Sequence, residues 1–146
     1  MLIRPFDRAD TDAVIALWHD CGLTRPWNDP RKDIERKLTQ QPELFLVGEV
    51  DGTVVASAMF GFDGTRGWVH YLAVHPSTQG HGAGRQLMAE GERMLAARGC
   101  PKLNLQVRTD NDDVLGFYAS IGYLRDDVVS LGKRLIADRL GPYTTP

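Results

Sequence analysis

The feature that most constrains the fold is a strand, a glycine-rich turn and a helix that follow one another within residues 69–98. The strand is rich in β-branched, aromatic and small apolar residues, and it ends before Pro76 because proline cannot extend a hydrogen-bonded ladder. Three glycines within residues 80–84 then allow a tight turn. The helix that follows has apolar residues at 3.6-residue spacing, and Gly99 ends it.

The glycine turn is expected to bind an anion. A helix start directs unpaired N–H groups and the positive end of the helix dipole toward one point, and phosphate is the usual ligand there. The alternative is that the glycines only close a tight connection. A nucleotide-hydrolase loop needs Gly-Lys-Ser/Thr, whereas Arg85 and Gln86 follow Gly84 here. The dinucleotide fingerprint needs a third glycine, where this chain has Leu87.

Composition is typical of a globular protein. The 146 residues suit one domain, and 42% of them are hydrophobic and 25% charged. A net charge of −2 gives no electrostatic reason to expect a nucleic acid or an anionic membrane as a partner. Cys21 and Cys100 are too few for a disulfide framework, and we find neither a signal peptide nor an apolar run of about 18 residues. A cytoplasmic location is therefore expected.

The N-terminal half is expected to form an antiparallel meander. Runs rich in β-formers predict strands at residues 2–6, 44–50, 53–62 and 67–74. Asp51-Gly52 is a strong hairpin signal, and another turn is expected at Asp63-Gly64.

Two helices are expected between the first two strands. Asp10 or Thr11 can cap the first helix, whose apolar stripe includes Trp18, and Gly22 ends it. The second helix starts with Asp29 as N-cap and a proline at its first position.

The C-terminal half alternates helices and strands. The helix after the glycine turn leads to a strand at residues 102–107, which must return parallel to the strand before the turn through a right-handed crossover. A shorter helix is expected at residues 112–120, and closing strands are expected at residues 123–124 and 128–133.

Two separated motifs resemble those of the GCN5-related N-acetyltransferases, the GNAT family. The first family motif is Gln/Arg-x-x-Gly-x-Gly/Ala after a strand ending in Val-x-Pro, and it is matched by Leu72-Ala73-Val74-His75-Pro76 and Gln79-Gly80-His81-Gly82-Ala83-Gly84. The second is Asn-x-x-Ala/Val-x-x-x-Tyr-x-x-x-Gly-Phe/Tyr, and it is matched by Asn111, Val114, Tyr118, Gly122 and Tyr123. The overall sequence is similar to the small bacterial YpeA-type acetyltransferases.

The resemblance implies the α/β (α+β) GNAT fold, with a mixed central β-sheet of six to seven strands flanked by about four helices. It implies that residues 1–140 form a single N-acetyltransferase domain, with residues 141–146 as a flexible C-terminal tail. The implied reaction transfers an acetyl group from acetyl-CoA to a primary amine of a small molecule, amino acid, protein or peptide, by direct attack in a ternary complex. Members of the family often form homodimers, so the resemblance also implies a possible homodimer.

The resemblance also implies site residues. The backbone of residues 72–74 would pair with the pantetheine arm, the amides of residues 79–84 would hold the pyrophosphate, and Tyr118 would act as catalytic proton donor to the thiolate. The implied cofactor-binding residues are Leu72, Ala73, Val74, Gln79, Gly80, His81, Gly82, Ala83, Gly84, Arg85, Asn111 and Tyr118. Gln79 replaces the commoner arginine, so a weaker electrostatic attraction for the cofactor is expected.

The general base is not evident, because neither Gly67-Trp68-Val69 nor Leu105-Gln106-Val107 contains the carboxylate that some relatives place in these strands. A lysine amine is neutral in about one molecule in a thousand at pH 7, which costs about 4 kcal/mol, whereas an α-amine costs under about 1 kcal/mol. An α-amine acceptor is therefore favoured. His70 is a candidate base, directly or through water, or else a cross-strand partner; Asp63 and Glu49 are weaker candidates, and Tyr71 is expected to serve packing.

Other functional assignments stay open. Trp18, Arg25, Trp27 and Asn28 could line the acceptor pocket, or Trp18 could be core and Trp27 a loop anchor. No metal is expected, because the three histidines at positions 70, 75 and 81 are spread over a strand end and a turn. A non-catalytic acyl-CoA-binding or sensing domain is the main alternative function, and a nucleotide-binding regulator is a third.

Overall fold

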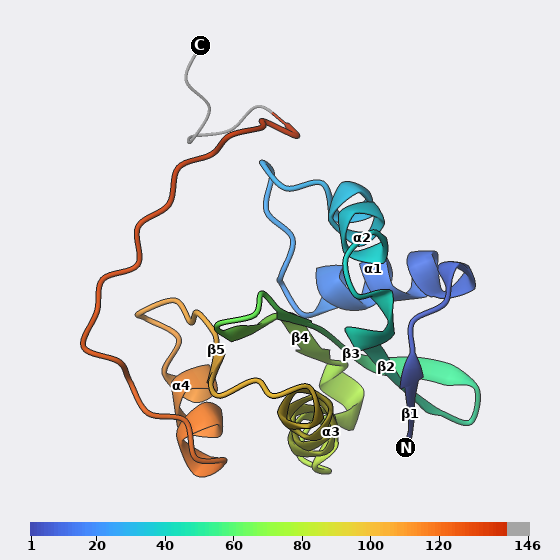
Figure 1. The fold of residues 1–146 in the computed structure, drawn as a ribbon. Coiled ribbons are helices and arrows are strands. Elements are labelled where there is room, and N and C mark those ends of the chain that lie inside the picture. Colours follow the sequence, from blue (N-terminus) through green and yellow to red (C-terminus); the bar gives the residue numbers. More distant parts are fainter. Residues whose placement is uncertain (140–146) are drawn as a thin grey trace.

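The computed structural model describes residues 1–139, and its centre is one β-sheet with strands in chain order (Figure 1). The strands are β1 (Leu2–Pro5), β2 (Phe45–Val50), β3 (Thr53–Phe62), β4 (Gly67–Val74) and β5 (Leu103–Asn104). The first four pair antiparallel, and β5 pairs parallel with β4. The predicted meander and the predicted parallel return are both confirmed.

The two hairpin turns form where the sequence predicts them. Asp51 and Gly52 both have positive φ, at 50° and 78°, as a two-residue turn matched to the sheet twist requires. At the next turn, Asp63 Oδ1 accepts hydrogen bonds from the backbone N–H groups of Thr65 and Arg66, both at 2.8 Å. These local contacts fix the register of three strands.

Four α-helices flank the sheet in the described part of the chain, and they are α1 (Thr11–Asp20), α2 (Pro30–Leu38), α3 (Ala83–Ala97) and α4 (Asp112–Ser120). The predicted cap of α2 is confirmed, because the Asp29 carboxylate accepts from two amides of its first turn. The predicted Asp10 cap of α1 is confirmed in position only, because Asp10 is the N-cap residue but its side chain makes no capping hydrogen bond. Asp10 instead forms a bidentate pair with Arg4 at 2.8 and 2.9 Å, and a side chain held by a distant arginine is not available to the helix start.

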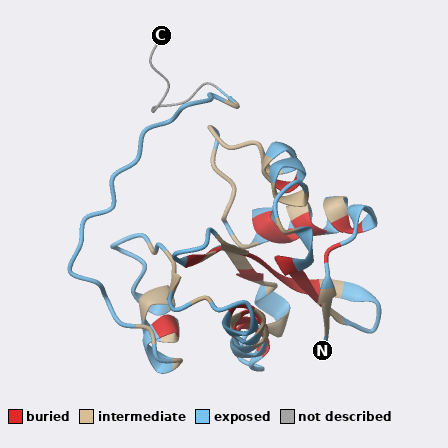
Figure 2. Ribbon diagram, in the orientation of Figure 1, coloured by how far each residue is buried: buried red, intermediate tan, exposed pale blue. Residues whose placement is uncertain are grey.

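The helices divide between the two faces of the sheet (Figure 1), and the buried residues lie between each pair of helices and the strands (Figure 2). Helices α1 and α2 cover one face around Val14, Leu17, Trp18, Ile34, Phe45, Val47, Met59 and Ala73. Helices α3 and α4 cover the other around Leu46, Ala56, Ala58, Phe60, Val69, Leu87, Met88, Leu95 and Tyr118. None of the helices within residues 1–139 is long and apolar enough to cross a membrane.

The sheet is smaller than predicted. Residues 1–139 form five strands rather than six to seven, β5 spans two residues rather than 102–107, and residues 123–124 and 128–133 carry no strand. The chain after α4 runs apart from the sheet (Figure 1). It contacts the segment that follows β5 through side chains, as in the hydrogen bond between Gln106 and Ser130. Without a neighbouring backbone edge, a β-prone run cannot form a ladder. The tail predicted at residues 141–146 lies outside the described residues.

Candidate active site

The glycine turn presents open backbone at the start of α3. Gly80 and Gly82 have φ of 84° and 81°, a left-handed conformation that favours glycine. Gly82 is the N-cap of α3, and no side chain caps this helix start. His81 and Arg85 are exposed beside it. The first N–H groups of α3 are therefore available to an anion, as the sequence predicts.

The glycine turn, the end of β4 and α4 meet at Gly84. A Cβ on this buried glycine would lie 3.1 Å from the Phe117 ring and 3.6 Å from the Val74 side chain. Gln79 ties the turn to the same strand end, because its side-chain amide donates to the Val74 carbonyl at 3.0 Å. The structure thus brings together the two motifs that the sequence selected separately.

Tyr118 lies on the inner side of α4, with 8% of its surface exposed. Its ring packs edge-on against Phe117 and Tyr123, at centroid distances of 5.1 and 5.5 Å. Burial raises the pKa of Tyr118 to about 12, so the phenol keeps its proton at neutral pH. Asn111 caps α4, and its side-chain oxygen accepts from the Val114 amide at 3.3 Å. In this structure the Asn111 side chain therefore serves the helix start.

Strand β4 is interrupted by a bulge at Tyr71 and Leu72. Ser57 pairs with Ala73 and Met59 pairs with His70, so two residues of β4 face one residue of β3. Tyr71 has a φ of 54°, which is rare for a residue with a side chain. A bulge leaves main-chain groups without ladder partners, and this one lies within the segment predicted to pair with a thioester.

Tyr71 does more than pack, which the sequence interpretation missed. Its ring stacks on Trp18 with centroids 3.9 Å apart, and its hydroxyl donates to Asp33 Oδ2 at 2.5 Å. Burial, together with the Asp33 carboxylate, raises the pKa of Tyr71 well above its usual value. No local sequence signal identifies Asp33 as its partner, because the two residues are 38 positions apart.

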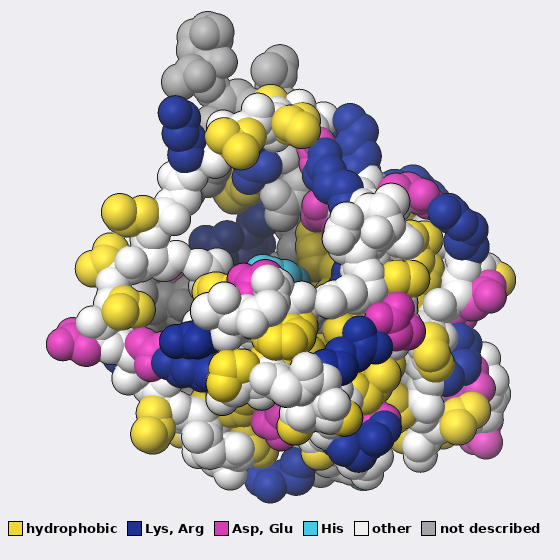
Figure 3. Space-filling view, viewed as in Figure 1, with side chains coloured by type: hydrophobic (Ala, Val, Ile, Leu, Met, Phe, Trp, Pro, Cys, Tyr) yellow, Lys and Arg dark blue, Asp and Glu magenta, His cyan; other side chains and the backbone are white. Residues whose placement is uncertain are grey.

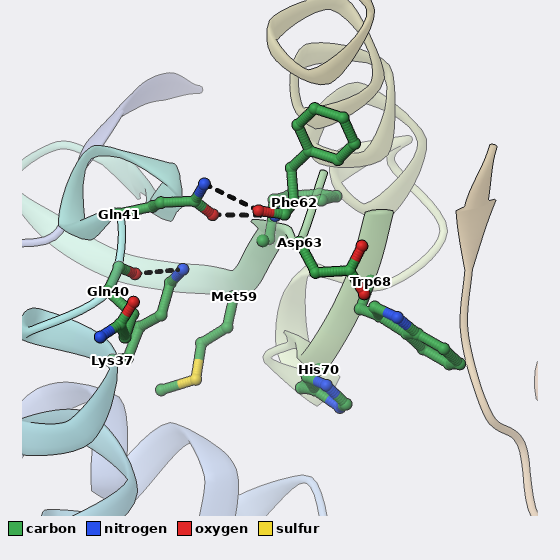
Figure 4. Close-up of a pocket in the computed structure, with 10 residues that line it drawn as sticks. Lys37, Gln40, Gln41, Met59, Phe62, Asp63, Trp68 and His70 are labelled. Atoms are coloured by element: carbon green, nitrogen blue, oxygen red, sulfur yellow. Dashed lines mark hydrogen bonds between the residues drawn. The ribbon is translucent and has the colours of Figure 1, made fainter. Parts of the chain in front are cut away.

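A cavity of about 320 Å³ opens beside β4 on the α2 side of the sheet. Figure 4 shows Trp68 and His70 projecting from β4 along one side and Lys37 and Gln41 along the other, with Met59 between them. Burial lowers the pKa of Lys37, whose ammonium group donates to the Gln40 carbonyl at 2.8 Å. The wall is mixed apolar and polar, which suits a small polar acceptor with an apolar part.

His70 is the predicted base candidate that lines this cavity. Its side chain is exposed at the cavity, and the surrounding protein lowers its pKa below the usual value, while Asp33 acts in the opposite direction. The imidazole is then mostly neutral at pH 7 and able to accept a proton.

The other predicted candidates are less suitably placed. Asp63 also lines the cavity, but it accepts hydrogen bonds within its own turn, and these lower its pKa. Glu49 pairs with Arg4 at 3.2 Å. Trp18 is fully buried core and donates to Ser57, which confirms the packing alternative, and the Arg25 guanidinium donates to the Gly22 carbonyl. Neither Trp18 nor Arg25 lines the cavity.

The histidines at positions 70, 75 and 81 have separate surroundings. His75 contacts Ser77 and Asp20, and His81 contacts the Thr78 carbonyl at 3.3 Å. Residues 1–139 contain no group of three or more His, Cys, Asp or Glu residues that could hold a metal ion.

Comparisons with known proteins agree with this arrangement. A model of the acetyltransferase (GNAT) family matches residues 11–123. An acetyltransferase of Yersinia pestis (strain Pestoides F) is 55% identical over 139 residues, which is 95% of this chain and 99% of the relative. Ard1 from Thermoplasma volcanium has a similar structure, with a TM-score of 0.77 and 27% identity over 84% of this chain and 82% of its own. PaiA N-acetyltransferase from Thermoplasma acidophilum, solved in complex with coenzyme A, shares the fold with a TM-score of 0.77 and 18% identity, over 88% of this chain and 92% of its own.

Proposed function

Since the chain belongs to the acetyltransferase (GNAT) family, we propose that this N-acetyltransferase moves the acetyl group of acetyl-CoA directly to a primary amine held in the same complex. Acetyl-CoA is the co-substrate of the family. The observation that carries the proposal is the junction at Gly84, where an uncapped helix start, the end of β4 and α4 are in contact. Direct transfer requires the donor and the reacting groups to be held at one point.

The cofactor-binding roles follow from the same junction. In the proposal, the amides of residues 79–84 bind the pyrophosphate with help from Arg85, and the backbone of residues 72–74 pairs with the pantetheine arm. Asn111 contributes from the start of α4. The Thermoplasma acidophilum protein, which has the same fold and was solved with coenzyme A, supports a cofactor site in this architecture.

The chemistry is a nucleophilic substitution at the thioester. The amine nitrogen forms a bond to the acetyl carbon, the carbon–sulfur bond breaks, and coenzyme A leaves with the electron pair on sulfur. Tyr118 donates its hydroxyl proton to this sulfur, and its raised pKa ensures that the proton is present. The amine loses one proton, and His70, directly or through water, is the proposed acceptor.

The acceptor is proposed to be an α-amine or another amine of low pKa. The cavity beside β4 lacks a carboxylate free of structural contacts, since Asp63 is held within its turn. A site with only His70 as base suits an amine that is already partly neutral at pH 7. The YpeA-type subgroup, the single domain over residues 1–140, the homodimer and the cytoplasmic location remain predictions.

The test combines calorimetry with a thiol-release assay. We expect the protein to bind coenzyme A and to release thiol from acetyl-CoA when supplied with amines of the α-amino class. Tyr118→Phe should retain coenzyme A affinity within about threefold and lose about a hundredfold in kcat, the usual contribution of a general acid. Thermal melting of the variant checks that it folds.

Two results would overturn the proposal. Tight coenzyme A binding without thiol release on any amine would support the sensing domain instead. Binding of ATP that coenzyme A cannot displace would support a nucleotide-binding regulator.

A further inference from the structure

We propose that Trp18, Ser57 and Asp33 are positioning residues, which hold the bulge of β4 in the shape that directs its main-chain N–H groups toward the thioester. The proposal rests on the proposed function, in which acetyl-CoA lies along β4. It concerns side chains on the α1 and α2 side of the sheet, none of which belongs to the two sequence motifs that select the cofactor site.

The backbone is strained at the bulge. A tyrosine at φ of 54° is strained relative to an ordinary strand conformation. Such a conformation persists only when surrounding contacts determine it. A glycine at this position would adopt the same backbone at no steric cost, so the strain comes from the side chain of Tyr71. The contacts that offset this strain must therefore act on Tyr71 itself.

A buried relay of two hydrogen bonds connects α1 to the bulge. The Trp18 indole N–H donates to Ser57 Oγ at 2.9 Å, and Ser57 Oγ donates to the Tyr71 carbonyl at 3.5 Å. Trp18 and Ser57 are both fully buried, so neither can exchange these partners for water. The relay holds the peptide plane that follows Tyr71, and this plane carries the N–H of Leu72.

The Tyr71 side chain is also held by contacts with both helices of this face. Its ring lies parallel to Trp18, at 11° between planes and 3.9 Å between centroids, and its hydroxyl donates to Asp33. A bond from a neutral donor to a carboxylate is stronger than one between two neutral groups. Backbone and side chain of one strained residue are thus both held, from two different helices.

The same contacts connect the bulge to the cavity. Asp33 and Lys37 are four residues apart on α2 and therefore face the same side, and Lys37 lines the cavity. His70, which directly precedes Tyr71, lines it from the strand. A displacement of α2 would therefore reach both the cavity wall and the bulge.

The experiment uses two conservative variants and one matched control in the full chain. Tyr71→Phe keeps the ring stack and removes the bond to Asp33, and Asp33→Asn keeps an acceptor oxygen but removes its charge. Glu35→Gln is the control, because it also removes a carboxylate from α2, at an exposed pair with Arg8. Each protein is measured for coenzyme A affinity, kcat and KM, and for the infrared stretch of ¹³C-labelled thioester carbonyl in bound acetyl-CoA.

We expect Tyr71→Phe to lose about tenfold in kcat with little change in KM for acetyl-CoA, because small displacements of donors reduce rates strongly. The carbonyl stretch should move back toward its value in free acetyl-CoA. Asp33→Asn should show a smaller loss, the double variant should be no worse than Tyr71→Phe, and Glu35→Gln should match the wild type.

Wild-type kcat and an unchanged carbonyl stretch in both variants would overturn the proposal, as would equal losses in Glu35→Gln. A loss of thermal stability without a change in the carbonyl stretch would also overturn it, because it would show a merely structural role. Failure of the proposed function is distinguishable, since the wild type itself would then bind no coenzyme A or release no thiol.

Discussion

The two faces of the sheet are joined to their helices by different kinds of contact. On the α3 and α4 face, bare backbone meets aromatic rings, with Gly84 against Phe117 and Gly91 against Phe60. On the α1 and α2 face, polar groups cross the interface, with Trp18 bonded to Ser57 and Tyr71 bonded to Asp33. Close contact between glycine backbone and aromatic rings stabilises the α3 and α4 face, and hydrogen bonds between side chains stabilise the α1 and α2 face.

The difference follows what each face is proposed to do. In the proposed function a pyrophosphate is bound by main-chain groups, and such a site needs glycines and tight packing near the turn. A strained main-chain conformation must be held by side chains from elsewhere in the fold. In the proposal, cofactor binding would therefore be specified by adjacent residues, whereas thioester activation would be specified by residues far apart in the sequence.

The largest expected effect tests close packing on the α3 face. In Gly91→Ala, the new Cβ would lie 2.2–2.5 Å from three atoms of the Phe60 ring, which is fully buried. We expect a loss of about 3 kcal/mol in the free energy of unfolding, measured by urea denaturation.

Gly116→Ala is the matched control, since this exposed glycine lies within α4 and nothing is within 4 Å of its added Cβ. It should stabilise the protein by about 0.5–1 kcal/mol. Similar losses in both variants would contradict the role given to close packing.

The next effect tests the polar contacts of the opposite face. Trp18→Phe keeps an aromatic ring against Tyr71 but leaves the buried Ser57 hydroxyl without its donor, and it leaves space where the larger indole was. We expect a loss of about 2 kcal/mol in unfolding free energy. A neutral result would show that this face, too, depends on apolar packing alone.

A smaller effect separates binding from stability at the glycine turn. Gly82→Ala introduces a side chain at φ of 81°, which strains the turn and should displace its amides. We expect coenzyme A affinity to fall about tenfold, measured by calorimetry. Gly132→Ala, at an exposed glycine without positive φ and with no atom within 4 Å, should bind as the wild type does.

The smallest effect concerns the pH dependence of stability. The pKa of Tyr118 rises from about 10 in the unfolded chain to about 12 in the folded protein, so the unfolded state ionises first as pH increases. Stability is unaffected below pH 10 and declines between pH 10 and 12. From pH 9 to 11, the wild type should lose about 1 kcal/mol more than Tyr118→Phe, measured by denaturation at each pH.

The comparison also explains which parts of the fold the sequence could predict. The hairpin at Asp51 and Gly52, the cap at Asp29 and the turn before α3 were predictable, because each is set by residues next to one another. The glycine turn and α4, which carry candidate cofactor residues, do meet, through the contact of Gly84 with Phe117. Their roles in binding remain predictions.

The errors have the opposite cause. Asp10 has a side chain of the type that caps helices, yet its carboxylate is bonded to Arg4 of β1 and not to the start of α1. Tyr71 gives no local signal of positive φ, because the contacts that hold it come from α1 and α2. The run at residues 128–133 is β-prone, but strand formation requires a partner, which propensity does not report.

The segment after α4 has a consequence for the molecule in concentrated solution. Its large apolar side chains are exposed to solvent (Figure 3), and they are Leu124, Val128, Val129, Leu131, Leu135 and Ile136. Gly132 and two cations, Lys133 and Arg134, interrupt this run between Leu131 and Leu135. Charges placed within an apolar run discourage β-aggregation. The highest concentration at which the protein stays dispersed should therefore depend on this segment and on the ionic strength that screens Lys133 and Arg134.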